Sequence, residues 1–76
     1  MVDFVDLDSS NLASAGYDDK SSELHVKFRN GGQFVYSGVP EETYKMLVTA
    51  SSPGSFFHKN VKGGGFKYRQ VTSPKG

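Results

Sequence analysis

The sequence predicts an α+β domain in which a small antiparallel sheet packs against two short helices. Three observations support this fold class. Apolar and polar residues alternate over residues 23–29, which is typical of a strand with one buried face. The segment Asn30-Gly31-Gly32 and a second apolar run at residues 34–36 follow directly, as in a β-hairpin. Pro40 then opens a segment whose apolar residues have helical spacing.

We expect three strands, and a fourth if the C-terminal segment joins the sheet. Residues 12–17 are rich in small side chains and precede a polar turn at residues 18–22, so they form the first predicted strand. Residues 23–29 and 34–36 form the second and third. Aromatic and cationic side chains alternate over residues 66–71, which predicts a fourth strand with its rings inward and its charges outward.

The two helices are predicted from their start signals. Pro40 suits the first position of a helix, and the carboxylates of Glu41 and Glu42 favour the positive end of its dipole. The second helix is expected to begin at Pro53 with Ser52 as its N-cap, and Gly63-Gly64-Gly65 ends it.

The chain length predicts a single domain over residues 1–76, with loose ends at about residues 1–8 and 72–76. The core of so small a domain contributes only about 3–5 kcal/mol net. The absence of cysteine excludes disulfides and thiolate metal sites, and it fits a reducing compartment. No apolar run is long enough to span a bilayer, and the acidic N-terminus is unlike a secretory signal. We therefore expect a cytoplasmic protein with no membrane partner.

The register of the hairpin decides where Phe34 and Tyr36 point. A two-residue loop places both rings on the face that carries the cationic side chains. The three-residue loop Asn30-Gly31-Gly32, with Gly32 left-handed, instead sets Phe28 opposite Phe34 and turns both rings into the core. A shift of one residue reverses the face of the whole strand. Leaving both rings in water forfeits about 1.5–3 kcal/mol each, which favours the core placement. The exposed placement stays open, and it would create a surface that stacks bases beside phosphate-neutralising cations.

Charge is distributed unevenly along the chain. Residues 1–44 contain all eight acidic residues and three basic ones, whereas residues 45–76 contain six basic residues and no acid. This asymmetry favours a polyanionic partner for the basic half. The alternative is that acids and bases neutralise one another across the folded domain, as the net charge of +1 allows.

No catalytic or metal-binding pattern is present in the sequence. His25 and His58 lack the further ligand that a metal site needs and the acid that a catalytic triad needs. Gly63-Gly64-Gly65 lacks the lysine of a phosphate-binding loop, and Glu41-Glu42 is explained by its place at a helix start. We therefore expect no enzyme activity and no cofactor.

From about residue 9 to residue 71 the chain resembles the KTSC family, a short domain found alone in bacterial proteins and at the C-terminus of some lysyl-tRNA synthetases. The segments that carry the resemblance are Ser9-Ser10-Asn11-Leu12, Gly16-Tyr17-Asp18, Leu24-His25-Val26-Lys27-Phe28, Asn30-Gly31, Phe34-Val35-Tyr36, Val39-Pro40 and Ala50-Ser51-Ser52-Pro53-Gly54-Ser55-Phe56-Phe57. The family centre is usually Tyr-x-Tyr, and Phe34 here lacks the first hydroxyl, which weakens any hydrogen-bonding role at that position. The resemblance implies RNA binding, through the synthetase association, and brings no catalytic residues.

Two functional hypotheses remain. The first is a small non-catalytic module that binds RNA through a cationic and aromatic face of the sheet. Its candidate contacts are His25, Lys27, Arg29, Phe34, Tyr36, Lys59, Lys62, Lys67 and Arg69. The second is a module or accessory subunit that binds another protein or its own copy through an exposed edge strand, for which residues 12–17 are the candidate.

Overall fold

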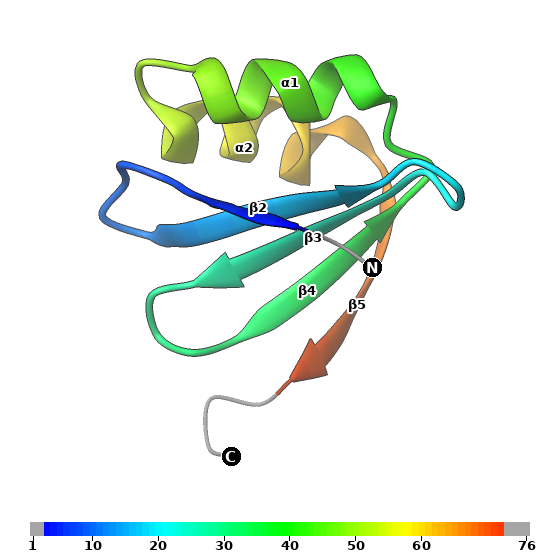
Figure 1. The fold of residues 1–76 in the computed structure, drawn as a ribbon, viewed down its shortest axis with the longest axis horizontal. Helices are drawn as coiled ribbons and strands as arrows, with labels where there is room; N and C mark the ends of the chain where they lie inside the picture. The colour runs from blue at the N-terminus through cyan, green and yellow to red at the C-terminus, as the bar shows by residue number, and fades with distance from the viewer. Residues whose placement is uncertain (1–2, 73–76) are drawn as a thin grey trace.

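The computed structural model describes residues 3–72 and contains one antiparallel sheet with two helices on one of its faces (Figure 1). In chain order the elements are β1 (Phe4–Asp6), β2 (Leu12–Asp18), β3 (Glu23–Phe28), β4 (Gln33–Ser37), α1 (Glu41–Thr49), α2 (Pro53–Asn60), the 3-10 turn η1 (Lys62–Gly64) and β5 (Lys67–Thr72). The strands lie in chain order across the sheet. Both helices are inserted between β4 and β5, which are nevertheless neighbours.

The α+β class is confirmed, and the predicted number of strands is too low. Residues 4–6 lie in the stretch that we expected to be loose, yet they pair with residues 14–16 of β2. Leu7 is buried, and its N–H donates to the carbonyl of Ala13 at 3.0 Å, which ties down the segment after β1. Since β1 covers β2, the expectation that residues 12–17 form an exposed edge is wrong. The edges of the described sheet are β1 and β5.

In the hairpin between β3 and β4 the side chains lie on the predicted faces of the sheet, but the loop lies one residue earlier than predicted. The N–H of Phe28 donates to the carbonyl of Gly32 at 2.8 Å, so the loop consists of residues 29–31 rather than 30–32. Gly31, not Gly32, has the positive φ of 99°, which glycine adopts without steric cost. Val26 therefore faces Phe34, and Leu24 faces Tyr36. The favoured core placement of both rings is confirmed, because a shift of two residues preserves the face.

The helix-covered face of the sheet forms the main core. Leu24, Val26 and Tyr36 pack there with Leu47 of α1 and Phe57 of α2. Figure 1 shows both helices on this side, while the opposite face of the sheet carries no helix. α2 begins at Pro53 as predicted, with Ser52 in the N-cap position but without a side-chain capping bond. α1 begins at Glu41, one residue later than predicted, because the extended backbone of Pro40 makes it the N-cap rather than the first helical residue. Neither helix in the described part of the chain is long and apolar enough to cross a membrane.

Candidate functional site

The structure separates the candidate contacts predicted from the sequence into two groups. The side chains of β3 and β5 that lie on the helix-free face are His25, Lys27, Lys67 and Arg69. Those on the opposite side or at its rim are Arg29 in the hairpin loop, Phe34 and Tyr36 on the core face, Lys59 in α2 and Lys62 in η1. The predicted sheet face that combines both rings with the strand cations therefore does not exist, because the hairpin parity turns the rings toward the helices.

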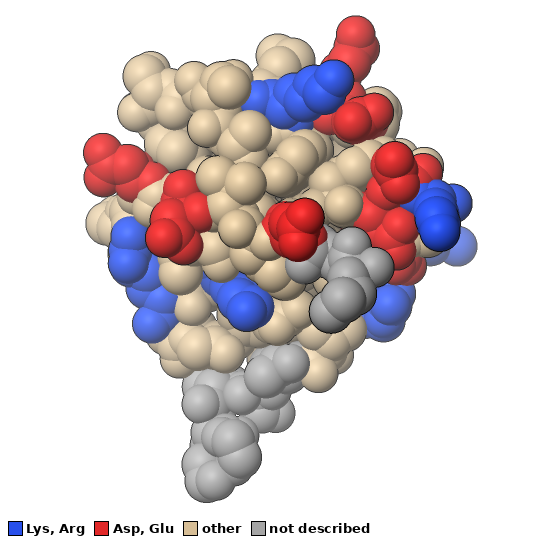
Figure 2. Space-filling model, in the orientation of Figure 1, with Lys and Arg blue, Asp and Glu red and all other residues tan. Residues whose placement is uncertain are grey.

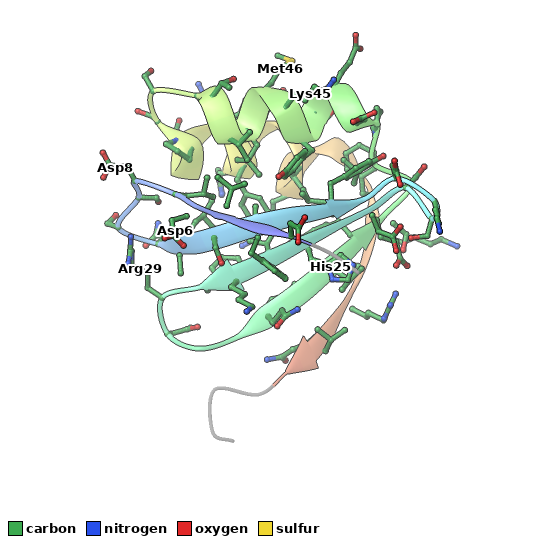
Figure 3. The ribbon with its side chains drawn as sticks, viewed as in Figure 1. Asp6, Asp8, His25, Arg29, Lys45 and Met46 are labelled. Carbon is green, nitrogen blue, oxygen red and sulfur yellow. The ribbon has the colours of Figure 1, made fainter. Side chains whose placement is uncertain are left out.

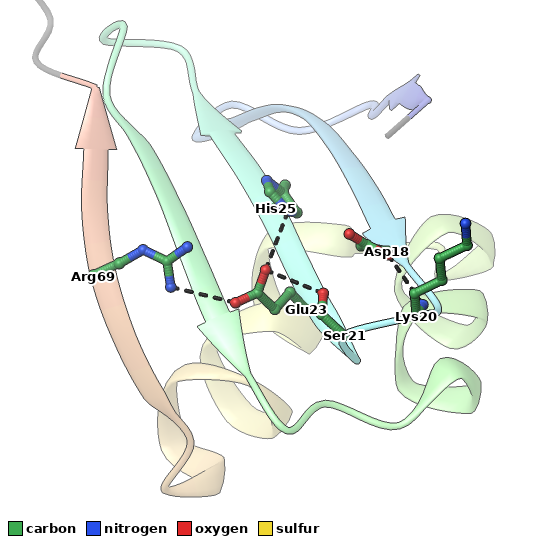
Figure 4. Close-up of polar contacts among 6 residues, drawn as sticks. All are labelled: Asp18, Lys20, Ser21, Glu23, His25 and Arg69. Carbon is green, nitrogen blue, oxygen red and sulfur yellow. Dashed lines mark hydrogen bonds and ion pairs between the residues drawn. The ribbon is translucent and has the colours of Figure 1, made fainter. Parts of the chain in front are cut away.

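On the helix-free face, three of the four basic side chains lie close to a partner group. Glu23 lies between Arg69 and His25, with one carboxylate oxygen 3.4 Å from Nη1 of Arg69 and the other 4.0 Å from Nε2 of His25 (Figure 4). Nε2 of His25 itself is buried without a hydrogen bond to any described residue. The ammonium of Lys27 stands 4.3 Å from the centre of the Phe4 ring, a distance at which cation–π attraction operates. Positive charge on this face is thus partly compensated, by Glu23 and by the Phe4 ring.

On the face of the molecule that Figure 2 shows, acidic side chains lie among basic ones. Figure 3 places Asp6 and Asp8 toward the end of the molecule that carries Arg29. Arg29 itself donates through Nε to the carbonyl of Ser9 and through Nη2 to the carbonyl of Leu7 at 3.1 Å. Its guanidinium therefore fastens the loop between β1 and β2 to the hairpin.

A groove of about 540 Å³ lies between this loop, the hairpin loop and α2. We call it the α2 groove, and its lining residues include Arg29, His58, Lys59 and Lys62. No acidic residue of the described chain lines it, and Asp8 lines an adjoining depression. His58 and Lys59 occupy the last turn of α2, where the helix dipole favours positive charge. The lining of the groove therefore combines several basic side chains with no carboxylate.

A second, smaller pocket of about 270 Å³ adjoins the α2 groove. We call it the ring pocket, and it is lined by Phe28, Asn30, Phe34, Tyr36, Lys62 and Tyr68. Phe28, Asn30 and Lys62 line both cavities, so the two lie next to each other. Tyr36 and Tyr68 are stacked with ring centres 5.3 Å apart. Tyr36 is only 4% exposed and Tyr68 is 63% exposed, so Tyr68 is the accessible member of the pair.

The environment of Tyr36 perturbs its acidity. Burial of its hydroxyl raises the pKa of Tyr36 above the ordinary value of 10.0, and the neighbouring Tyr68 raises it further. Burial disfavours the tyrosinate because the charged form loses hydration. At neutral pH the pocket therefore presents an uncharged hydroxyl and aromatic carbon beside the ammonium of Lys62.

The sequence predicts no role at the site for Tyr68 or Asn30, which line the ring pocket. The alternation over residues 66–71 predicts that the Tyr68 ring faces the core, and the ring does lie on the core side. It remains 63% exposed because β5 is the last strand of the described sheet. His58 lies four residues before Lys62, so their proximity follows from chain order. The position of Lys62 beside Asn30 and Tyr68 depends on how the chain after α2 packs against the hairpin, for which the sequence carries no direct signal.

The described residues show no arrangement suited to metal binding. Among residues 3–72 there is no group of three or more His, Cys, Asp or Glu side chains that could hold an ion. The side chains that line the two cavities offer cation–anion attraction in the α2 groove and ring stacking in the ring pocket.

The fold and these cavities define a small α+β domain with a basic groove and an adjoining aromatic pocket. The model of the KTSC domain matches residues 8–68, so the chain belongs to the KTSC family. The crystal structure of a KTSC domain protein from Yersinia pestis is similar with a TM-score of 0.88 and 33% sequence identity, covering 95% of this chain and all of that one.

Three further relatives match in sequence, each at 36% identity. An uncharacterized protein of Stutzerimonas stutzeri aligns over 88% of this chain and 94% of its own length. A protein of Tsukamurella paurometabola aligns over 74% of this chain and 84% of its own length. A lysine–tRNA ligase of Trichormus variabilis aligns over 74% of this chain, which is only 10% of the ligase. The same domain thus occurs as most of a small protein and as a minor part of a large one.

Proposed function

We propose that this chain is a small non-catalytic module of the cytoplasm that binds RNA in the α2 groove. The supporting observation is the absence of any acidic lining residue beside Arg29, His58, Lys59 and Lys62. Backbone phosphates are attracted to such an unbalanced cluster of basic side chains, and release of their counterions favours association. The helix-free face is less suitable because Glu23 already neutralises Arg69 there.

The comparison with relatives supports the same class of ligand. One relative is a lysine–tRNA ligase, an enzyme whose name gives tRNA as a substrate. The domain occurs within such an enzyme and also as most of a small protein. This distribution is consistent with an RNA-binding module that works in different protein contexts. We assign phosphate contacts to Lys59 and Lys62, whereas Arg29 positions the groove through its bonds to the loop carbonyls.

The test compares three double variants that each remove two positive charges. Lys59→Ala/Lys62→Ala alters the groove, Lys27→Ala/Lys67→Ala alters the helix-free face, and Lys20→Ala/Lys45→Ala serves as the matched control. Figure 3 places Lys45 on the outer side of α1, away from the sheet. Binding of a fluorescently labelled single-stranded RNA is measured by anisotropy at several salt concentrations.

We expect the logarithm of the association constant to fall with the logarithm of salt concentration by about 0.7 per neutralised phosphate. The groove variant should bind more weakly and lose about 1.4 from that slope, since two phosphate contacts are removed. The other two variants should keep nearly the slope of the unaltered protein. Absence of binding at low salt, or equal weakening in all three variants, would refute the assignment.

A second candidate function is the binding of a protein strand at β5. Among the described strands β5 pairs with β4 alone, so one edge of residues 67–72 is open to main-chain pairing. This relocates the edge-strand hypothesis from residues 12–17, which are interior. If the partner is a second copy of the chain, sedimentation velocity must show association that grows with concentration. A monomer at all concentrations would exclude that partner.

A further inference from the structure

We propose that the ring pocket accepts one unpaired nucleobase, so that the domain selects single-stranded over double-stranded RNA. This inference rests on the proposed function and specifies the form of nucleic acid that the same site recognises. It is carried by the aromatic lining of the ring pocket and by the residues that this pocket shares with the α2 groove, rather than by the basic charge that supports RNA binding in general.

The lining of the pocket is aromatic on several sides. Phe28 and Phe34 meet edge-on with centres 5.6 Å apart, and Phe34 lies 6.1 Å from Tyr68 in a tilted arrangement. Tyr68 stacks on Tyr36 and remains largely exposed. Flat rings of this kind stack with any base, because every base has an aromatic face. A base on Tyr68 would extend the existing Tyr36–Tyr68 stack by one ring.

One polar group in the pocket is held in a defined orientation. Oδ1 of Asn30 accepts a hydrogen bond from the N–H of Gly32 at 2.9 Å, which fixes the amide plane. The NH2 group of Asn30 makes no hydrogen bond to another described residue and can donate to an acceptor on a ligand. Every nucleobase presents such an acceptor at its edge, so this contact orients a base without strict selection among the four.

Lys62 connects the two cavities. It lines the ring pocket and the α2 groove alike, so its side chain is within reach of a nucleotide that enters either cavity. A nucleotide can therefore place its base against Tyr68 while its phosphate meets Lys62 and Lys59. The phosphate contact is available to every nucleic acid, whereas the stacking contact with Tyr68 is available only to an unpaired base.

A base in a duplex cannot present its face to the ring pocket. The volume of about 270 Å³ accommodates a single ring system. A paired and stacked base presents only its edge in a groove of the helix, so its face cannot reach Tyr68. The domain should consequently bind loops, ends or linear strands and discriminate against the interior of a duplex.

The experiment compares Tyr68→Ala with Tyr68→Phe, which keeps the ring, and with Met46→Ala, which removes another exposed apolar side chain. Figure 3 shows Met46 on α1, on the far side of the helices from the sheet. Because Tyr68 is exposed, its replacement should leave the fold intact, which circular dichroism checks. The ligands are a single-stranded RNA, a blunt RNA duplex of the same length and inorganic polyphosphate of similar charge.

We expect Tyr68→Ala to weaken single-strand binding by about 5- to 150-fold with no change in the salt slope, as the loss of one stacked base predicts. Tyr68→Phe and Met46→Ala should bind like the unaltered protein, and duplex and polyphosphate should bind more weakly than the single strand. If Tyr68→Ala binds normally, or if the duplex and polyphosphate bind as well as the single strand, the base pocket is wrong although RNA binding in the α2 groove survives. If the unaltered protein binds no RNA at low salt, the proposed function itself fails.

Discussion

The helix-free face of the sheet and the α2 groove both carry basic side chains, and they differ in what lies beside those charges. On the helix-free face Glu23 approaches Arg69 and His25, and Lys27 stands over Phe4. In the α2 groove the described lining contains no carboxylate. Cations with a local partner are already compensated, whereas cations without one attract an external anion. The comparison shows that the number of basic residues in a segment indicates an anion-binding surface less well than the position of the nearest acidic residue does.

The two faces also differ in how they bury apolar side chains, which gives the prediction with the largest effect. Val26 and Val35 are both fully buried, at 0% and 1% exposed, yet Val26 lies under the helices and Val35 lies on the helix-free face between His25 and Arg69. We expect Val26→Ala to destabilise the domain by about 2–3 kcal/mol, because its cavity is closed by packed helices. Val35→Ala should cost about 1.5 kcal/mol, since the flexible side chains over it can collapse into the space.

Urea unfolding of the two valine variants measures this difference, provided that both keep the m-value of the unaltered protein. Equal losses of stability would mean that the side chains over Val35 are as rigid as the helices over Val26. In that case the distinction between the faces would apply to charge and not to packing.

The second prediction concerns the hairpin loop that sets the faces apart. Gly31 has a φ of 99°, in the region that side chains avoid, so Gly31→Ala should cost about 1–2 kcal/mol. Gly31→Asn should cost less, because asparagine tolerates left-handed conformations better than alanine does. Thermal unfolding of both variants checks the order. If alanine and asparagine are equally harmful, the backbone conformation is not the cause of the loss.

Strands β2 to β5, both helices and the faces of the hairpin strands could be predicted from periodicity and turn chemistry. The exact loop could not, because Asn30-Gly31-Gly32 allows a left-handed residue at either glycine and only the pairing across the strands decides between them. β1 could not be predicted because a strand of three residues is too short to show a periodic pattern. Lys59 and Lys62 were candidate contacts because of their charge, and both line the α2 groove. The position of Lys62 beside Tyr68 depends on how the chain after α2 packs against the sheet, which no local pattern encodes.

The third prediction tests the balance of charge on the helix-free face. Glu23→Gln removes the carboxylate that pairs with Arg69 and His25, and because Arg69 is largely exposed the loss should be only about 0.2–1 kcal/mol. The same change frees Arg69 to attract anions, so weak RNA binding that does not require Lys59 or Lys62 should appear at low salt. Glu42→Gln, at an exposed position on α1, is the matched control and should produce neither effect. If the Glu23→Gln protein binds RNA like the unaltered protein, neutralisation by Glu23 is not the reason why the helix-free face does not bind RNA.

The fourth and smallest effect concerns the ionisation of Tyr36. Its pKa is raised above 10.0 by burial first and by Tyr68 second, so the folded state holds the neutral form more strongly than the unfolded chain does. The stabilisation is therefore complete below pH about 10 and is lost as the pH rises through the higher folded pKa. Burial also raises the pKa of Tyr44, so a spectrophotometric titration of the tyrosines should contain late transitions from both residues. Tyr36→Phe should remove one of them and leave that of Tyr44.

The same titration connects the core face with the ring pocket. Tyr68→Ala exposes Tyr36 to water and removes its neighbour, so the pKa of Tyr36 should fall toward 10.0. A base stacked in the pocket should act in the opposite direction, because it excludes water from the same hydroxyl. Phosphates held in the α2 groove also raise this pKa, because their negative charge disfavours the tyrosinate. An upward shift that a single strand produces and inorganic polyphosphate of similar charge does not produce would therefore indicate a base in the ring pocket.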